Sequence, residues 1–341
     1  MRVTKMRVSL LAAGAAVLFT TVLAQQPPAA PPAGAPAGAP AGAPAGAPAG
    51  QGQGRGGGRG PAAVPDVPPM KVYIYGGPKT HGEGQHDYPQ FVADWSKILQ
   101  NRGALVDGGL HFPSARELTG VDVLVIYKGD AGYVSLEDRA NLDHYLRRGG
   151  GIISLHDGLC SDDTAYFSNI VGGAKKHGEV NYTLEANVPY TIVDKAHPIM
   201  KGMEDFKITD EAFFLMTWSK QPEIHVLATA VIDGTPSAGT HKGEVVPQIW
   251  TYEKSLAPAP SGSPYRAFVW MQGHNYANFA LPNVQAMMLR AIAWAGKRPV
   301  ETLMTELPQR GGGRGTAPGE TPGAPAAAPG AGRGSAVGAG S

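Results

Sequence analysis

The chain has 341 residues, and its 29 Lys and Arg residues nearly balance 28 Asp and Glu residues, which gives a net charge of +1 at pH 7. The sequence lacks both a long basic run and the clustered cations and aromatic residues of nucleic-acid sites, so we expect no nucleic-acid partner. Its 47 glycines and 30 prolines are concentrated at the two ends, and these ends cannot form a packed core.

Residues 1–24 have the pattern of a secretory signal peptide. Basic residues precede an almost entirely apolar run at 8–23, and the small residue Ala24 ends an acceptable cleavage pattern. The alternative is an uncleaved membrane anchor, for which the run is slightly short. We therefore predict an exported, periplasmic or extracellular protein that has no membrane attachment once the signal peptide is cleaved.

Two further segments are predicted to be disordered. Residues 25–69 form a Pro/Ala/Gly-rich linker with a recurring Ala-Gly-Ala-Pro unit, and residues 306–341 form a similar tail. Both have few large apolar side chains, so burial cannot offset the entropy lost on ordering them. The remaining residues, 70–305, are a suitable length for one α/β domain with a full core.

Strands and helices alternate through the first half of this domain. Apolar runs predict strands at 71–75, 104–106, 121–127 and 151–155. Residues 91–99 carry apolar side chains at helical spacing. A second helix is expected from an N-cap at Ser135, with Asp138 three residues later, to Arg148. This alternation predicts a doubly wound parallel sheet, whose ligands bind beyond the carboxyl ends of the strands.

The second half of the domain is richer in β-structure. Further strands are predicted at 181–186, 224–231, 245–252 and 266–271. A final helix begins near Pro282, and its methionines belong to an apolar stripe that is typical of core packing.

Histidines lie at several predicted strand ends. His81 and His86 follow the first strand, His156 follows the strand at 151–155, His177 follows a Gly-Gly turn, and His274 follows the strand at 266–271. One such residue alone is more often a hydrogen-bonded loop histidine. Several that converge on one edge of a sheet indicate a shared site for proton transfer or metal binding.

The turn His156-Asp157-Gly158 resembles a nucleophile elbow that lacks a nucleophile. The exposed turn position is occupied by histidine instead of Ser or Cys. Cys160, the only cysteine, lies four residues later and is predicted to be a buried bystander. Covalent acyl chemistry is therefore not expected, and no intramolecular disulfide can form.

The adjacent acids Asp210 and Glu211 allow two interpretations. They are either a solvated turn, or Glu211 is a general base or a metal ligand, because sets of histidine and carboxylate suit zinc and related ions. The sequence has no regular ligand spacing such as His-Glu-x-x-His, so a metal site would have to be assembled from distant loops.

Taken together and in order, the motifs resemble the ThuA-like (trehalose utilisation) family of the class I glutamine amidotransferase-like superfamily. The matching segments are Gly149-Gly150-Gly151-Ile-Ile-Ser-Leu-His156, His197-Pro198-Ile199 with Gly202, Asp210-Glu211, Pro247-Gln-Ile-Trp250, Gly273-His274 and Ala293-Trp294-Ala295. The resemblance implies a flavodoxin-like, mostly parallel sheet with the β-rich second half in the same domain. It also implies a role in carbohydrate catabolism. His156 matches the position of the catalytic Cys in the amidotransferases, so that activity is not expected here.

The residues and the resemblance together select a candidate site. The proposed catalytic residues are His156, Glu211 and His274. The proposed substrate-binding residues are His81, Asp157 and Trp250. The proposed ligands of a divalent metal, zinc or similar, are His81, His156, His177, Glu211 and His274.

Two function classes follow. The first is an exported enzyme, such as an isomerase, lyase or hydrolase, that acts on a sugar or keto-sugar by His/Glu acid–base or metal-assisted chemistry. The alternative is a non-catalytic sugar-binding or scaffolding module with an amidotransferase-like fold. A small-molecule carbohydrate is the expected partner in either case, and the oligomeric state is left open.

Overall fold

The computed structural model describes residues 68–308, except 180, 235 and 257–262. The predicted signal peptide lies outside the described residues. The two predicted tails also lie outside them, apart from a few residues at the inner end of each tail. Within the described part, no helix is both long and apolar enough to cross a bilayer.

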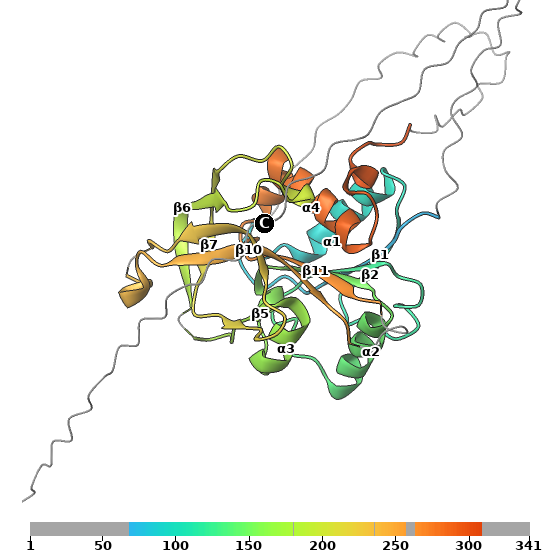
Figure 1. The fold of residues 1–341 in the computed structure, drawn as a ribbon, viewed down its shortest axis with the longest axis horizontal. Coiled ribbons are helices and arrows are strands. Elements are labelled where there is room, and N and C mark those ends of the chain that lie inside the picture. Colours follow the sequence, from blue (N-terminus) through green and yellow to red (C-terminus); the bar gives the residue numbers. More distant parts are fainter. Residues whose placement is uncertain (1–67, 180, 235, 257–262, 309–341) are drawn as a thin grey trace, which may run out of the picture. The chain divides into compact units, whose positions relative to one another are not determined.

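One nine-stranded sheet organises the fold, in the order β2-β1-β3-β4-β11-β10-β9-β6-β7 (Figure 1). The first five strands are mutually parallel, and they are β1 (Lys71–Gly76), β2 (Leu105–Gly109), β3 (Val123–Tyr127), β4 (Gly151–Leu155) and β11 (Tyr265–Trp270). The other four pair antiparallel, and they are β6 (Tyr182–Ile192), β7 (Phe206–Phe213), β9 (His225–Val231) and β10 (Val245–Lys254). The short strands β5 (Gly173–Ala174) and β8 (Thr217–Trp218) form a separate pair.

Helices cover both faces of the parallel half. They are α1 (Tyr88–Gln100), α2 (Leu136–Arg147), α3 (Thr164–Val171) and α4 (Pro282–Ala295). The predicted start of α2 is confirmed, because Ser135 and Asp138 form a capping box at that end. Helix α3 was not predicted from the sequence.

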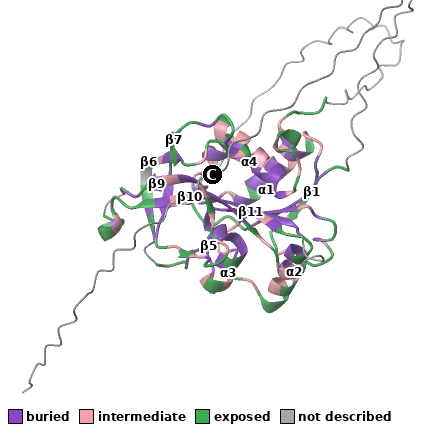
Figure 2. Cartoon of the chain, in the orientation of Figure 1, coloured by how far each residue is buried: buried purple, intermediate pink, exposed green. Residues whose placement is uncertain are grey.

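The core has two layers because successive residues of each buried strand point to opposite faces. In β3, Val123 and Val125 pack in the layer that contains α1 and α4, whereas Leu124 and Ile126 pack in the layer that contains α2 and α3. Every residue of this strand is buried, and Figure 2 shows buried residues along the central strands β10 and β11 as well. Each such side chain stabilises the fold by roughly 1.5–3 kcal/mol relative to an exposed one, which explains the continuous apolar run.

The predicted mixed α/β fold is confirmed, and two local interpretations are corrected. Asp210 and Glu211 do not form a solvated turn, because both lie in β7 and both are buried. Trp250 lies in β10 with its indole fully buried, where Nε1 donates a hydrogen bond to the Val171 carbonyl at 2.8 Å.

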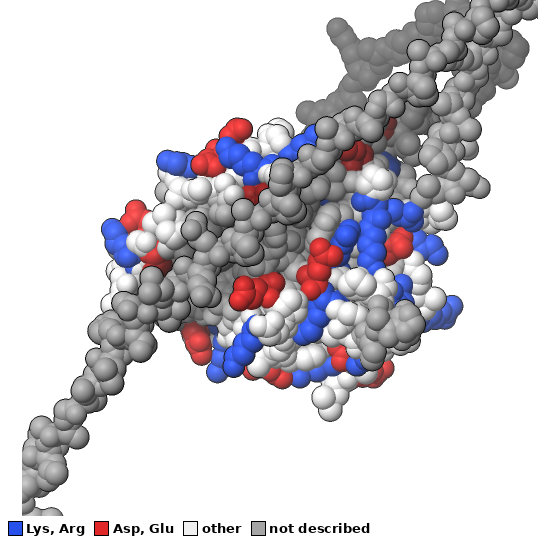
Figure 3. All heavy atoms as spheres, in the orientation of Figure 1, with Lys and Arg blue, Asp and Glu red and all other residues white. Residues whose placement is uncertain are grey.

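On the face drawn in Figure 3, Lys and Arg side chains are interspersed with Asp and Glu side chains over the described surface. Several form pairs, such as Arg266 with Glu253 at 3.1 Å. Exposed pairs of this kind contribute little to stability, about 0–1 kcal/mol each. The folded state is therefore stabilised mainly by the two-layer core.

Candidate functional site

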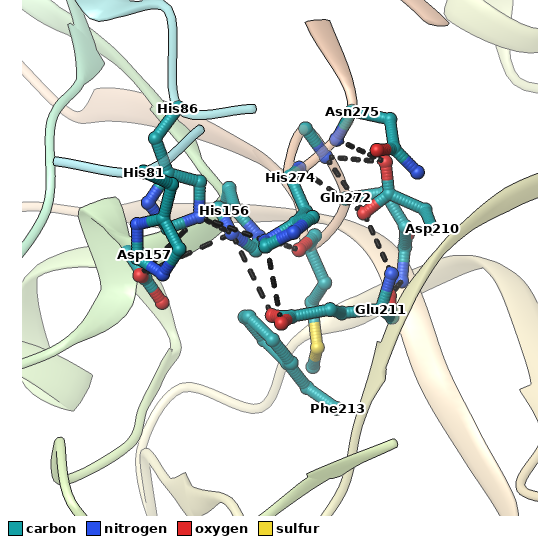
Figure 4. A network of polar contacts seen from close by, with 12 residues as sticks. His81, His86, His156, Asp157, Asp210, Glu211, Phe213, Gln272, His274 and Asn275 are labelled. Atoms are coloured by element: carbon teal, nitrogen blue, oxygen red, sulfur yellow. Dashed lines mark hydrogen bonds and ion pairs between the residues drawn. The ribbon is translucent and has the colours of Figure 1, made fainter. Parts of the chain in front are cut away.

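Three histidines meet at the carboxyl ends of the parallel strands. His156 directly follows β4, His274 follows the neighbouring strand β11, and His86 lies in the loop between β1 and α1. We call these three residues the histidine cluster (Figure 4). All three are almost completely buried. The structure thus brings together three of the histidines that the sequence places after predicted strands.

The ring nitrogens of the histidine cluster point at one another. His86 Nε2 lies 2.9 Å from His156 Nε2 and 3.0 Å from His274 Nδ1. A neutral imidazole has only one N–H group. The contacts made by the outer nitrogens therefore decide where that proton is held.

The outer nitrogens of His156 and His86 have oxygen partners that can hold those protons. His156 Nδ1 lies 3.2 Å from the Met271 carbonyl, which can only accept, so this nitrogen is the protonated one and Nε2 presents a lone pair. His86 Nδ1 lies 3.1 Å from the Thr80 hydroxyl, which can accept its proton in the same way. Oxygen partners that fix the tautomer are typical of metal-binding histidines.

Burial keeps the histidine cluster uncharged at neutral pH. Loss of solvent, aided by the neighbouring His156, lowers the pKa of His86 to about 2. Burial likewise lowers the pKa of His156 to about 4 and the pKa of His274 below its usual value. Neutral imidazole is the form that binds metals.

The donor set fits a zinc-like ion. Zn–N bonds of about 2.0 Å in a tetrahedral site place the nitrogens about 3.3 Å apart, close to the separations seen here. Glu211 supplies a carboxylate beside them, with Oε1 3.3 Å from His274 Nδ1 and Oε2 3.7 Å from His156 Nε2. Glu211 is thus placed either as a fourth ligand or as a base next to the ion.

Glu211 has an unusual proton affinity. Its side chain is buried on β7, and this burial, together with the nearby charge of Asp157, raises the pKa of Glu211 to about 8. A carboxyl group with a pKa near the working pH is suited to general acid–base catalysis.

Asp157 connects the histidine cluster to a buried lysine. Its Oδ2 lies 3.9 Å from the Nε2 atoms of both His86 and His156, and its Oδ1 lies 3.2 Å from Lys175 Nζ. Burial opposes the carboxylate charge, but the adjacent His156 and Lys175 outweigh it and hold the pKa of Asp157 below its usual range. Asp157 is therefore ionised at neutral pH.

Asp210 fixes the loop that carries His274. Its carboxylate accepts hydrogen bonds from the backbone N–H groups of Gly273, His274 and Asn275 at 3.1–3.3 Å and from Asn278 Nδ2 at 2.7 Å. Burial nonetheless raises the pKa of Asp210 to about 6. These donors make Asp210 a positioning residue for His274.

The backbone of the site is strained where the ligands are presented. His156 has φ +53° and His86 has φ +48°, values in the left-handed region that cost non-glycine residues about 1–3 kcal/mol. Gly273 has φ +135°, and a Cβ atom there would lie 3.3 Å from the Cβ of His156. The turn after β4 thus has the strained geometry expected of an elbow, with histidine at its apex.

A small cavity of about 60 Å³ opens beside the histidine cluster. The residues that line it are His81, His86, Asp157, Lys175, His177, Gly178, Glu179, Asn181, Tyr182 and Glu211. Pockets that enclose a whole small molecule usually exceed about 300 Å³. Only the reacting end of a sugar-sized molecule would fit inside, and the remainder would lie at the mouth.

The candidate residues from the sequence fall into three groups. His156, His274, Glu211 and Asp157 meet in one network. His81 is exposed and packs against His86 at the cavity wall, with ring centroids 3.9 Å apart and ring planes tilted by 56°.

His177 and Trp250 lie elsewhere. His177 also lines the cavity, but Nδ1 contacts Asp130 Oδ1 at 2.6 Å and not the histidine cluster. Trp250 is not among the residues that line the cavity, and its complete burial corrects the proposed substrate-binding role.

Two residues of the site were missed by sequence reasoning. His86 occupies the place in the cluster for which His81 was proposed. Lys175 was not considered, although it is buried against Asp157. Of these two, only His86 could have been found from the sequence, because it shares a loop with His81.

Comparison with known proteins gives the family. The family model for ThuA, described as trehalose utilisation, matches residues 72–295. The chain belongs to the ThuA family. No match was found among curated proteins.

Two solved structures are similar to this ThuA-family protein. A ThuA-like protein from Bacteroides uniformis ATCC 8492 is 16% identical with a TM-score of 0.52, and the match covers 72% of this chain and 99% of that one. A ThuA-like protein from Parabacteroides merdae ATCC 43184 is 19% identical with a TM-score of 0.48, covering 71% and 94%. At these identities, the first likeness concerns the fold alone. The family description supports a carbohydrate-related role.

Proposed function

We propose that this ThuA-family protein is an exported enzyme that acts on a keto-sugar or related sugar, with Glu211 as the acid–base residue beside a divalent ion held by the histidine cluster. The observation that carries the proposal is the convergence of three neutral, buried imidazole nitrogens next to a carboxylate. A buried arrangement that costs backbone strain and desolvation is characteristic of functional sites.

The chemistry that suits these residues is proton transfer next to a carbonyl group. When bound, the ion would supply Lewis-acid polarisation of a substrate oxygen. Glu211 lies within reach of the same point and can remove and return a proton because its pKa is about 8. His86, His156 and His274 would hold the ion, and the burial of the site limits access of water.

The order of the parallel strands supports a site at the histidine cluster. The parallel strands follow the order β2-β1-β3-β4-β11, which corresponds to the flavodoxin-like order 2-1-3-4-5, and helices pack on both faces. We infer a flavodoxin-like, doubly wound sheet, extended by four antiparallel strands. Sites in such sheets lie at the carboxyl ends of the strands, where the histidine cluster is found.

Export is part of the proposal on the strength of residues 1–24 alone. It would supply the enzyme with sugars in the periplasm or outside the cell. Fractionation of cells that produce the full chain, followed by N-terminal sequencing of the mature protein, would test this part. Retention of residues 1–24 on a protein in the cytoplasm would contradict it.

The central experiment combines metal analysis with a substrate assay. Purified protein is analysed for bound metals and then incubated in D2O with methyl 3-keto-glucopyranoside, and deuterium uptake next to the carbonyl is followed by NMR. We expect one divalent ion per chain and exchange above the uncatalysed rate.

A matched pair of variants controls the experiment. His156→Ala should lose both the ion and the exchange, whereas His144→Ala, at an exposed position of α2, should keep both. A folded, metal-loaded wild-type protein that exchanges no deuterium with any keto-sugar would sink the proposed reaction. Sugar binding without turnover would instead favour a binding module.

A further inference from the structure

Lys175 is held rigidly beside the turn that carries His156 and Asp157. It directly follows β5, its backbone N–H donates to the Leu159 carbonyl at 3.1 Å, and its carbonyl accepts from the Ser161 N–H at 2.9 Å. The segment after β5 is thus paired with the segment after β4. This pairing fixes the position of the Lys175 backbone relative to the turn that carries His156.

The ammonium group of Lys175 lies in the wall of the cavity. Only 5% of the residue is exposed, and Nζ lies 3.2 Å from Asp157 Oδ1 and 3.5 Å from the centre of the Phe213 ring. An ammonium group has three N–H donors. One carboxylate oxygen and the rings of Phe213 and Tyr182 surround it, and it retains the capacity to donate to a ligand oxygen in the cavity.

A buried lysine of this kind is not explained by stability. Taking a lysine and an aspartate out of water costs several kcal/mol per ion, and buried pairs can often be replaced by apolar residues without loss of stability. Burial opposes the charge of Lys175, but Asp157 outweighs it, so the pKa of Lys175 lies above its usual value. The cation therefore persists at neutral pH, at a cost that a functional role would explain.

The charge pattern of the cavity also singles out this residue. Among the described residues that line it, Lys175 is the only lysine or arginine, and it faces a site with two buried carboxyl groups, those of Asp157 and Glu211. A reaction that moves a proton to Glu211 leaves negative charge on the substrate. A fixed cation in a water-poor site is the most effective stabiliser of such charge.

We infer that Lys175 is a catalytic residue that donates a hydrogen bond to the carbonyl oxygen of a keto-sugar and stabilises the negative charge that forms there. This inference rests on the proposed function, which it extends to the oxygen of the substrate. The substrate class is a sugar with a free ketone group next to a C–H bond.

The step is balanced without any further reactant. The C–H bond next to the carbonyl breaks, and the proton passes to the Glu211 carboxylate. The electron pair of that bond forms a C=C bond, and the carbonyl π electrons move to the oxygen, which Lys175 holds as an enolate. Return of the proton from Glu211 regenerates a ketone.

Two measurements test the inference. The first is calorimetric binding of D-arabinonohydroxamate, which mimics an enediolate, to the metal-loaded wild type and to Lys175→Met. The second is deuterium exchange with methyl 3-keto-glucopyranoside in the same proteins. Lys176→Met is the matched control, because the neighbouring lysine side chain is 57% exposed. We expect Lys175→Met to weaken binding at least 10-fold and to slow exchange at least 100-fold, and Lys176→Met to change neither by more than 2-fold.

Equal hydroxamate affinity in the wild type and Lys175→Met would overturn the inference, whatever the activity. If the unpaired Asp157 prevents Lys175→Met from folding, Lys175→Arg and Lys175→Gln decide instead. The charged arginine should bind at least 5-fold more tightly than the neutral glutamine, and equal binding would overturn the inference. Failure of the proposed function is distinguishable, because the wild type would then bind the hydroxamate through Lys175 but exchange no deuterium.

Discussion

Two groups of potential metal ligands lie near the same cavity, and they differ in burial. The histidine cluster is buried, and its nitrogens converge within 3.0 Å of His86 Nε2. The second group, which we call the outer group, consists of Asp130, Cys160 and His177, whose ligand atoms lie within 4.8 Å of one another. In the outer group His177 is exposed and already paired with Asp130.

The difference shows which features indicate a metal site. Each group contains residue types that bind zinc. In the histidine cluster, a carbonyl fixes the tautomer of His156, a hydroxyl can hold the outer proton of His86, and burial removes the competing protons. In the outer group, burial raises the pKa of the Cys160 thiol, so the thiolate that a metal requires is disfavoured. These features favour the histidine cluster as the site of the proposed ion.

The largest expected effect separates the two groups directly. His156→Ala removes a ligand whose lone pair points into the cluster, and we expect zinc affinity to fall more than about 100-fold, beyond the 10–100-fold typical of outer partners. His177→Ala should change zinc affinity less than about 3-fold. Competition titrations with a chromophoric chelator measure both. Similar losses in the two variants would remove the distinction between the groups.

The second prediction concerns the support of the histidine cluster. Asp210→Asn replaces a carboxylate that accepts hydrogen bonds from five donors with a group that cannot accept them all. We expect the free energy of unfolding to fall by about 2 kcal/mol and zinc affinity to fall about 10-fold. Urea denaturation and chelator competition measure the two effects. Asp107→Asn, at an exposed position of β2, is the control, and an equal loss there would refute the assignment.

The pH dependence of the metal-free protein should also reflect the histidine cluster. In the folded state the pKa of His156 is about 4, whereas an unperturbed histidine has a pKa of 6.5. The unfolded chain therefore binds more protons between these values, and stability is lost as the pH falls below 6.5. For His156 alone this amounts to about 3 kcal/mol by pH 4. Thermal unfolding in EDTA at pH 7.5 and pH 5 measures it, and His156→Gln should flatten the dependence.

The smallest expected effect lies in the outer group. Cys160 is fully buried with a raised thiol pKa, so the native protein should react with iodoacetamide much more slowly than the urea-unfolded chain. Cys160→Ala should leave zinc affinity within about 2-fold of the wild type. A rapid reaction of the native thiol, or loss of zinc from this variant, would bring the outer group into the site.

The sequence was sufficient for elements whose pattern is locally decisive. The run at 151–155 coincides with β4, and the capping residues Ser135 and Asp138 mark the start of α2. Strand β7 was missed because two successive buried positions carry the acids Asp210 and Glu211, where apolar side chains are expected. Function there has replaced the alternation on which strand prediction depends.

The membership of the site was harder to predict than its location. His81 and His86 share one loop, and only the left-handed backbone at His86 turns that ring inward. Lys175 and Lys176 form a pair of adjacent cations that resembles a solvated turn. The sequence contains no signal for the pairing of segments that buries the first lysine and leaves the second exposed.

The backbone pairing of two loops has a consequence for how a substrate can enter. The His86 N–H donates to the His274 carbonyl at 3.0 Å, and the Tyr276 N–H donates to the Gly84 carbonyl at 2.8 Å. These bonds join the two loops across the chain, so one cannot swing away without the other. Among the described residues, no backbone hydrogen bond joins the opposite rim, around His177 and Tyr182, to either of these two loops. We therefore expect a substrate to enter past that rim, while the joined loops hold His86 and His274 in place.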